Sequence, residues 1–172
     1  MRKYSKAQIA LHWLTAGLVL FLAGSGLAFS FEIADAGRGT ILAHQIAGQV
    51  LVCVVALRIF TRFARKTAPT PSSHAIWEQR LAHCVHIALY IALIVFVITG
   101  YVSASAMSTN ALIAPVDIGF ARSDTGERLL EIHYAMKWVL LGLFGLHFAG
   151  VLKHAFIDRD DTFSNMRFNS SR

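Results

Sequence analysis

Histidines inside apolar stretches are the residues of this sequence best suited to chemistry. Five of them stand in long runs of apolar residues: His12, His44, His86, His133 and His147. An ionisable side chain within a membrane-length apolar stretch is costly, so it indicates a functional site. A neutral imidazole is a good ligand for a transition metal, and two imidazoles can bind one metal ion from opposite sides. The pattern therefore favours metal-centred chemistry inside a membrane.

The spacing of these residues indicates two sites at different depths. His133 and His147 share one stretch and are separated by almost four helical turns, so both rings leave the same helix face about 21 Å apart along its axis. That separation suits two stacked haems. The same interval separates His44 from Arg58. A buried arginine needs an anion, and a haem propionate is the candidate that we expect.

Four apolar stretches must position these residues. They cover roughly residues 9–31, 41–63, 81–107 and 129–156, and each is long enough to cross a hydrocarbon core of ~30 Å. The chain has 172 residues, of which 55% are hydrophobic, and its mean hydropathy is +0.53. These values exclude an ordinary soluble domain. We expect an all-α, up-and-down four-helix bundle that forms a single transmembrane domain over residues 1–172.

The distribution of charge predicts the orientation. Three basic residues lie in the connections on one side: Arg38, Arg122 and Arg128. Twelve lie on the other side: Arg2, Lys3, Lys6, Arg58, Arg62, Arg65, Lys66, Arg80, Lys153, Arg159, Arg167 and Arg172. The positive-inside rule then places both termini in the cytoplasm. The net charge of +6 is explained by topology and contact with anionic lipid, and no nucleic-acid-binding domain is expected.

Depth along the alternating spans sorts the histidines into groups. His44 and His133 both fall near the outer side, so they are expected to bind an outer haem between them. His147 falls near the inner side, where either His12 or His86 lies opposite it as the second ligand. His86 is equally a candidate for a quinone site. The sequence has no Cys-x-x-Cys-His motif, so we expect both b haems to be bound non-covalently.

Polar residues at the expected cytoplasmic end are candidates for proton transfer to a quinone. His154 and His86 are suited to relay protons because imidazole titrates near neutral pH. Lys153 and Asp158 are expected at the mouth of such a path, beyond which the tail is expected to fray. Arg58 is a further quinone-site candidate.

Small residues close to the expected ligands allow two interpretations. Three glycines lie in these positions: Gly48, Gly142 and Gly145. They permit either a porphyrin plane or a neighbouring helix to approach closely. Cys53 and Cys84 are expected to be small core residues, because two membrane cysteines make no disulfide framework.

Several sequence stretches together resemble the prokaryotic cytochrome b561 family, in particular its four-helix superoxide oxidase branch. They are residues 4–13 (YSKAQIALHW), 81–90 (LAHCVHIALY), 131–133 (EIH), 145–154 (GLHFAGVLKH) and 158–166 (DRDDTFSNM). The resemblance implies a superoxide:ubiquinone oxidoreductase of the bacterial inner membrane.

The same resemblance implies a set of site residues. One b haem would be bound by His12 and His147, and the other by His44 and His133. Ubiquinone would bind near the inner haem. The residues implied there are His86, Arg58 and His154.

The charge of the outer side keeps other functions open. Superoxide is an anion, and a positive surface would attract it. The outer segments instead carry six acidic residues: Glu32, Asp35, Asp117, Asp124, Glu127 and Glu131. An acidic face suits a basic protein donor, so the alternative is an electron-transfer subunit that links a periplasmic redox protein to the quinone pool. A histidine-lined metal transporter is disfavoured by the depth-matched histidine pairs and by the lack of carboxylates within the spans.

Overall fold

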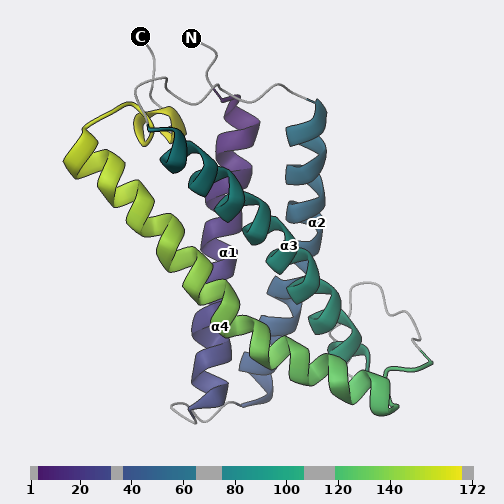
Figure 1. Ribbon diagram of the computed structural model, residues 1–172. Helices are drawn as coiled ribbons and strands as arrows, with labels where there is room; N and C mark the ends of the chain where they lie inside the picture. Colours follow the sequence, from purple (N-terminus) through teal and green to yellow (C-terminus); the bar gives the residue numbers. More distant parts are fainter. Residues whose placement is uncertain (1–3, 32–36, 65–74, 107–118, 168–172) are drawn as a thin grey trace.

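Four long helices form the protein in the computed structural model, which describes residues 4–31, 37–64, 75–106 and 119–167 (Figure 1). The helices are α1 (Lys6–Ser30), α2 (Arg38–Ala64), α3 (Ile76–Ala106) and α4 (Asp124–Leu152). A π-helical turn, Lys153–Asp158, continues α4, and a short 3₁₀ helix, Ser164–Met166, follows. No strand occurs in the described ranges, and each long helix is long and apolar enough to cross a membrane. The predicted all-α four-helix architecture is confirmed.

The helices extend beyond the apolar stretches because local polar contacts set their ends. The Oγ of Ser5 accepts a hydrogen bond from the backbone N–H of Gln8 at 3.3 Å, and Oε1 of Gln8 accepts one from the N–H of Ser5 at 3.0 Å. This capping box starts α1 before its first apolar residues. At the start of α4, a Cβ on Gly126 would lie 2.0 Å from the carbonyl oxygen of Ala121, so only glycine allows the preceding turn to fold back there.

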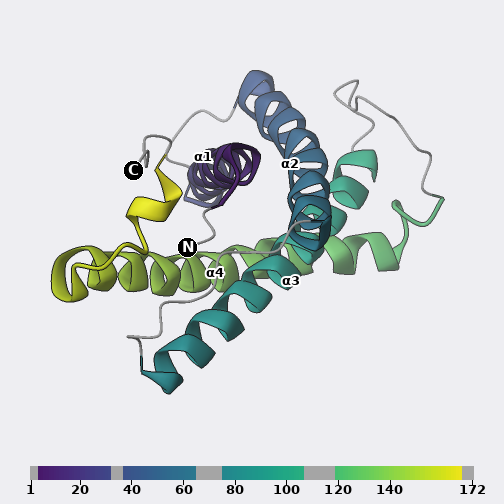
Figure 2. The ribbon, with the colours of Figure 1, turned by 90° about the horizontal axis from the view of Figure 1, so that it is seen from above.

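Helices that follow one another in the chain pack side by side, and α4 makes only slight contact with α1 (Figures 1 and 2). We call the end that holds Lys6, Ala64, Ile76 and Leu152 the proximal end, and the other the distal end. Nε1 of Trp13 donates a hydrogen bond to the carbonyl oxygen of Met166 at 2.8 Å. The first and last described segments therefore meet at the proximal end.

An apolar layer fills the middle of the bundle. Its buried members are Val19, Leu22, Leu51, Val55, Ala92, Leu93, Phe96 and Leu140. Leu140 is midway between His133 and His147 along α4, and Leu51 is midway between His44 and Arg58 along α2. This mid-bundle layer therefore separates polar side chains at two depths by about 10 Å on either side.

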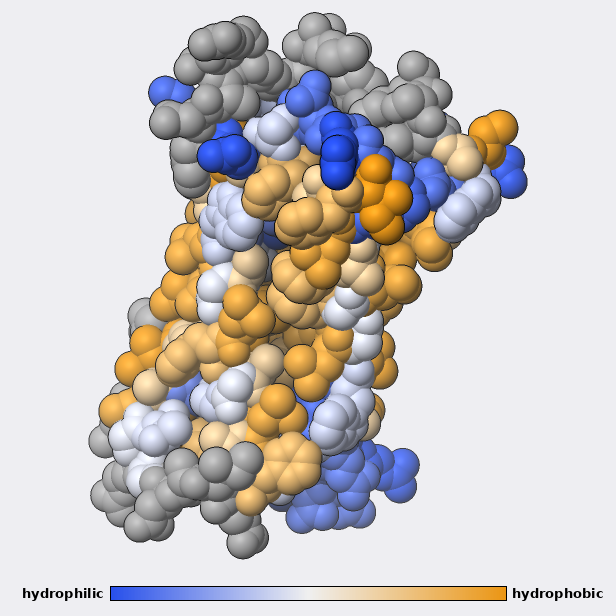
Figure 3. All heavy atoms as spheres, turned by 90° about the vertical axis from the view of Figure 1, so that its left-hand side faces the viewer, coloured by the Kyte–Doolittle hydropathy of each residue, from blue (hydrophilic) through white to orange (hydrophobic). Residues whose placement is uncertain are grey.

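The outer surface is largely apolar. Large side chains such as Phe60, Leu57 and Ile98 are more than half exposed, and Figure 3 shows apolar residues covering the middle of one face, with hydrophilic residues gathered toward its two ends. A soluble monomer rarely exposes so much continuous apolar surface. Lipid is the solvent that this surface fits.

Three expectations about individual residues are corrected. Cys53 and Cys84 are exposed on the bundle surface and are not core residues. The described tail after Asp158 does not fray, because it folds back onto α1 through the bond from Trp13 to Met166. Met107, the last residue of the third expected span, lies outside the described residues, as do the linker residues 66–73.

Candidate functional site

His44 on α2 and His133 on α4 face each other near the distal end. Their ring centroids are 6.5 Å apart, and the ring planes are inclined by 85°. Both rings are partly buried. We call these two residues the distal pair.

Hydrogen bonds engage Nδ1 of each ring of the distal pair and leave Nε2 available to bind a metal. The Oγ of Ser25 lies 2.7 Å from Nδ1 of His44 and 2.9 Å from the carbonyl oxygen of Phe21, so a hydroxyl that donates to this carbonyl accepts from Nδ1–H of His44. Nδ1–H of His133 donates to the carbonyl oxygen of Phe96 at 3.1 Å, with the Thr99 hydroxyl 3.2 Å away. In both rings Nε2 therefore carries a lone pair, which is the arrangement by which proteins orient histidines as metal ligands.

The ring of His133 is held in a tight slot. Phe96 stacks on it with centroids 4.2 Å apart and planes inclined by 25°. A Cβ added to Gly100 would lie 2.8 Å from Cε1 and 3.2 Å from Nδ1 of this ring. A Cβ added to Gly26 would lie 3.7 Å from Cε1 of His44, which is ordinary van der Waals contact. The glycine at position 100 is therefore required by the position of His133.

Gly100→Ala is expected to displace the His133 ring and to weaken the binding of any group that it ligates. Crowding of this kind costs about 1–3 kcal/mol, which corresponds to roughly tenfold or more in affinity. The measurement is the absorbance of the bound chromophore per purified chain. Gly39→Ala is the control, because Gly39 is exposed in the first turn of α2 and no atom lies within 4 Å of a Cβ there. Equal absorbance in both variants would contradict the assignment of His133 as a ligand of that chromophore.

Two cavities flank the distal pair, and both histidines line each of them. One, of about 60 Å³, extends between α1 and α4 past Ala23, Leu140 and Phe144. The other, of about 310 Å³, extends between α2 and α3 past Gly48 and Val97. A flat group lying between the two rings would project into both spaces. A Cβ on Gly48 or on Gly145 would meet no atom within 4 Å, so in this structure neither glycine serves close helix packing.

His12, His86 and His147 gather near the proximal end. The ring of His147 lies 6.3 Å from that of His12 and 5.2 Å from that of His86, measured between centroids. Three different helices supply these rings, which we call the proximal group. The structure therefore brings together both residues between which the sequence left the choice open.

Arg58 joins the proximal group from α2. Its Nη2 donates a hydrogen bond to Nδ1 of His12 at 2.9 Å, and its Nε donates to the hydroxyl of Tyr90 at 3.2 Å. The guanidinium also lies over the Tyr90 ring, 5.5 Å from the centroid. A cation placed between neutral partners in an apolar bundle is poised to bind an anion.

The hydrogen bonds of His12 and His86 differ. Nδ1–H of His86 donates to the carbonyl oxygen of Ala82 at 2.5 Å, which leaves Nε2 free as in the distal pair. His12 uses Nδ1 to accept from Arg58, so its proton lies on Nε2. The distance between ring centroids favours His12 as the second ligand beside His147. The position of the ring proton favours His86, because its Nε2 is unprotonated.

The residues present fit bis-histidine haem. Two imidazoles that bind one iron from opposite sides, each with its nitrogen about 2 Å from the metal, have centroids roughly 6 Å apart. The separations of 6.5 Å between His44 and His133 and 6.3 Å between His12 and His147 agree with this value. Cavities lined by both rings of the distal pair lie beside it on two sides.

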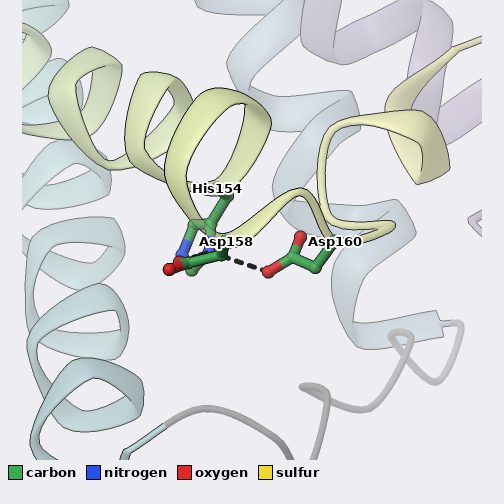
Figure 4. A group of neighbouring side chains, drawn as sticks. All are labelled: His154, Asp158 and Asp160. Carbon is green, nitrogen blue, oxygen red and sulfur yellow. Dashed lines mark hydrogen bonds and ion pairs between the residues drawn. The ribbon is translucent and has the colours of Figure 1, made fainter.

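His154 belongs to a separate network of carboxylates at the proximal end, with Asp158 and Asp160 (Figure 4). Lys153 joins this network through Asp158. Nζ of Lys153 pairs with Glu78 of α3 at 2.8 Å and with Asp158 at 2.6 Å. Nδ1 of His154 lies 2.9 Å from a carboxylate oxygen of Asp158 and 2.9 Å from one of Asp160. His154 follows His147 by two helical turns, about 10 Å along the axis. These two candidates therefore lie beyond the proximal group, toward the end of the bundle.

Sequence reasoning missed the partners that orient the histidines. Ser25, Thr99 and Tyr90 each bond a site residue from another helix. Only Tyr90 carries a signal in the sequence, since it lies one turn after His86 on the same face. Glu78 was also missed, because its partner Lys153 lies on a different helix and the spacing of the two residues in the sequence does not indicate their contact. His83 is exposed on α3, and His74 lies outside the described residues.

Comparison with known proteins agrees with this geometry. The chain is 26% identical to cytochrome b561 homolog 2 of Escherichia coli (strain K12) over 98% of its length and 93% of that protein. It is 25% identical to the probable superoxide oxidase CybB of Yersinia pestis over 96% of both proteins. The family profile of prokaryotic cytochrome b561 matches residues 3–169. With four membrane-length helices and histidine rings facing each other at two depths, the chain belongs to the prokaryotic cytochrome b561 family, whose multi-pass bacterial membrane proteins transfer electrons with b-type haem.

Proposed function

We propose that this chain is a superoxide:ubiquinone oxidoreductase that contains two b haems in one transmembrane domain. The observation that carries the proposal is the pairing of His44 with His133 and of His12 with His147, at similar separations on opposite sides of the mid-bundle layer. Two ligand pairs on either side of an apolar layer suit the transfer of electrons across a membrane. The family supports membrane electron transfer with b-type haem.

In this proposal the two histidine pairs would hold the haem irons. Bis-histidine haem supplies reversible one-electron transfer without an open coordination site. Ser25 and the carbonyl of Phe96 would hold the distal rings by their Nδ1 atoms, which leaves Nε2 of each ring to bind iron. Arg58 balances a propionate at the proximal depth.

The proximal end faces the cytoplasm in the proposal, with both termini on that side. The predominance of basic residues at this end supports the orientation by the positive-inside rule. Superoxide then reacts at the periplasmic face and leaves as dioxygen. Membrane lipid surrounds the apolar surface of the bundle in this proposal.

Ubiquinone binds near the proximal group, beside His86 and Arg58. Two superoxide ions supply two electrons, and two protons from the cytoplasm complete ubiquinol. His154 and Lys153 take part in proton uptake, because their network of carboxylates lies between the proximal group and the end of the bundle. His86 delivers a proton over the last part of the path.

Rapid mixing of the oxidised, purified protein with superoxide tests the proposal. We expect fast haem reduction, and ubiquinol formation when ubiquinone is present, because a small anion needs only to reach the distal haem edge. Measurements at several superoxide dismutase concentrations separate this reaction from dismutation. Slow reduction that is independent of superoxide concentration would overturn the assignment of the donor.

The second candidate function is an electron-transfer subunit for a periplasmic protein donor. Exposed acidic residues on the first turns of α4 favour it: Asp124, Glu127 and Glu131. They form a face that would attract a basic redox protein. This function predicts slow reduction by superoxide and rapid, salt-sensitive reduction by a basic cytochrome.

A further inference from the structure

Lys137 is a cation within the membrane-spanning part of α4 that the histidine sites do not account for. Its Nζ donates to the Oγ of Ser30 at 2.5 Å and lies 5.4 Å from the ring centroid of Trp138 and 5.7 Å from that of Tyr134. All of these partners are neutral. Among the described residues, no carboxylate lies within ion-pair distance of this ammonium group.

The side chain of Lys137 also lines the cavity between α1 and α4. His44 and His133 line the same cavity, and its other walls are mostly apolar, from Val19, Leu140 and similar residues. Lys137 is the one charged residue among the described residues that line it. An apolar space with two imidazoles and a single cation matches a flat apolar ligand that carries an anionic group.

We propose that Lys137 anchors a carboxylate of the haem that the distal pair binds, which rests on the function proposed above. The position of Lys137 carries the proposal, since it follows His133 by one helical turn on the same face of α4. A haem propionate projects from the edge of a group held between His44 and His133, and this cavity is one of the two spaces open to that edge. The bond to Ser30 holds the ammonium at the cavity wall.

An ammonium beside the distal haem favours its reduced, less positive state. Removing the charge therefore lowers the equilibrium constant for reduction. We expect Lys137→Met and Lys137→Gln each to lower it about tenfold for the distal haem, which is about 59 mV for a one-electron couple. The proximal haem is expected to keep its potential, because the mid-bundle layer lies between it and Lys137.

A redox titration of the purified holoprotein, followed by the visible spectrum, measures both haems. Lys137→Arg keeps the charge. It is expected to leave the equilibrium constant for reduction of the distal haem within twofold of the wild-type value. Ser30→Ala removes the hydrogen bond but not the charge, and the same small change is expected. Arg128→Met is the matched control, because it removes one positive charge from an exposed site on the same helix.

Haem dimethyl ester lacks free carboxylates. Reconstituting wild-type and Lys137→Met protein with this ester therefore distinguishes a propionate from other anions as the partner of Lys137. The variant is expected to lose haem b from the distal site faster than the wild type does, and to lose the ester at the wild-type rate, because the ester offers Lys137 no carboxylate to pair with. A difference in the rate of loss that persists with the ester would assign Lys137 to a lipid or substrate anion and overturn the proposal. An effect of Ser30→Ala as large as that of Lys137→Met would also overturn it, since the role would then be helix packing.

The haem content of the wild type separates this proposal from the function on which it rests. Two haems per chain together with an unchanged potential in both neutral variants would overturn the role of Lys137 alone. A wild type that binds no distal haem would overturn both.

Discussion

Replacement of His44 or His133 by alanine is expected to remove one of two b haems and to leave the other in place. Each residue supplies one of two axial ligands to the distal haem in the proposed site, and alanine has no group to replace it. The proximal group is separated from the distal pair by the mid-bundle layer, so its haem is expected to remain. A pyridine haemochrome assay should give two haems per wild-type chain and one in either variant.

His83→Ala is the control for this experiment. His83 is an exposed histidine on α3 and is not among the proposed ligands, so its loss removes an imidazole but no ligand. We expect two haems in that variant. One haem per wild-type chain, or the loss of both haems from His44→Ala with the helices intact by circular dichroism, would contradict the proposed arrangement.

The four-helix architecture could be predicted because the membrane constrains it. Apolar length defines a span, and alternation of direction assigns a depth to each residue. Depth alone was enough to match His44 with His133, and His147 with His12 or His86. It could not choose between the last two, because that choice depends on how α1 and α3 are rotated about their axes.

The partners of the histidines could not be predicted for the same reason. Ser25 and Thr99 lie on other helices than the rings that they bond, and nothing in their spacing indicates which way they face. The sequence did not point to Lys137, because the orientation was predicted from basic residues in the connections and near the ends of the spans. Lys137 lies inside a span. Its meaning depends on a cavity that only the packed helices form.

The ends of the helices depended on polar detail. The capping box at Ser5 and the turn before Gly126 set where α1 and α4 begin, and neither follows from hydropathy. At the other end of α4, a network of charged residues accompanies the π-helical turn that follows Leu152. Its members Lys153 and His154 are predicted from the sequence as candidates for the quinone site or its proton path, and their carboxylate partners depend on the folded end of the bundle.

The arginine in the proximal group makes the choice between His12 and His86 chemically informative. While Arg58 donates to Nδ1 of His12, the proton of that ring lies on Nε2, and no lone pair is free for iron. Coordination by His12 therefore requires Arg58 to release the ring. The released guanidinium then has lost a neutral partner and is free to bind a propionate. Ligation by His12 and the pairing of Arg58 with an anion support each other in this way.

His12→Ala is therefore expected to abolish the proximal haem, while His86→Ala keeps it and slows the reduction of ubiquinone. The separation of 6.3 Å between His12 and His147 equals that of the distal pair to within 0.2 Å, whereas the 5.2 Å between His86 and His147 is too short for an iron to lie between the rings. Haem content and ubiquinol formation, measured on the same preparations, separate the two roles. If His86→Ala loses the proximal haem and His12→Ala retains it, the bond between His86 and the carbonyl of Ala82 orients the ligand, and Arg58 holds His12 for the quinone instead.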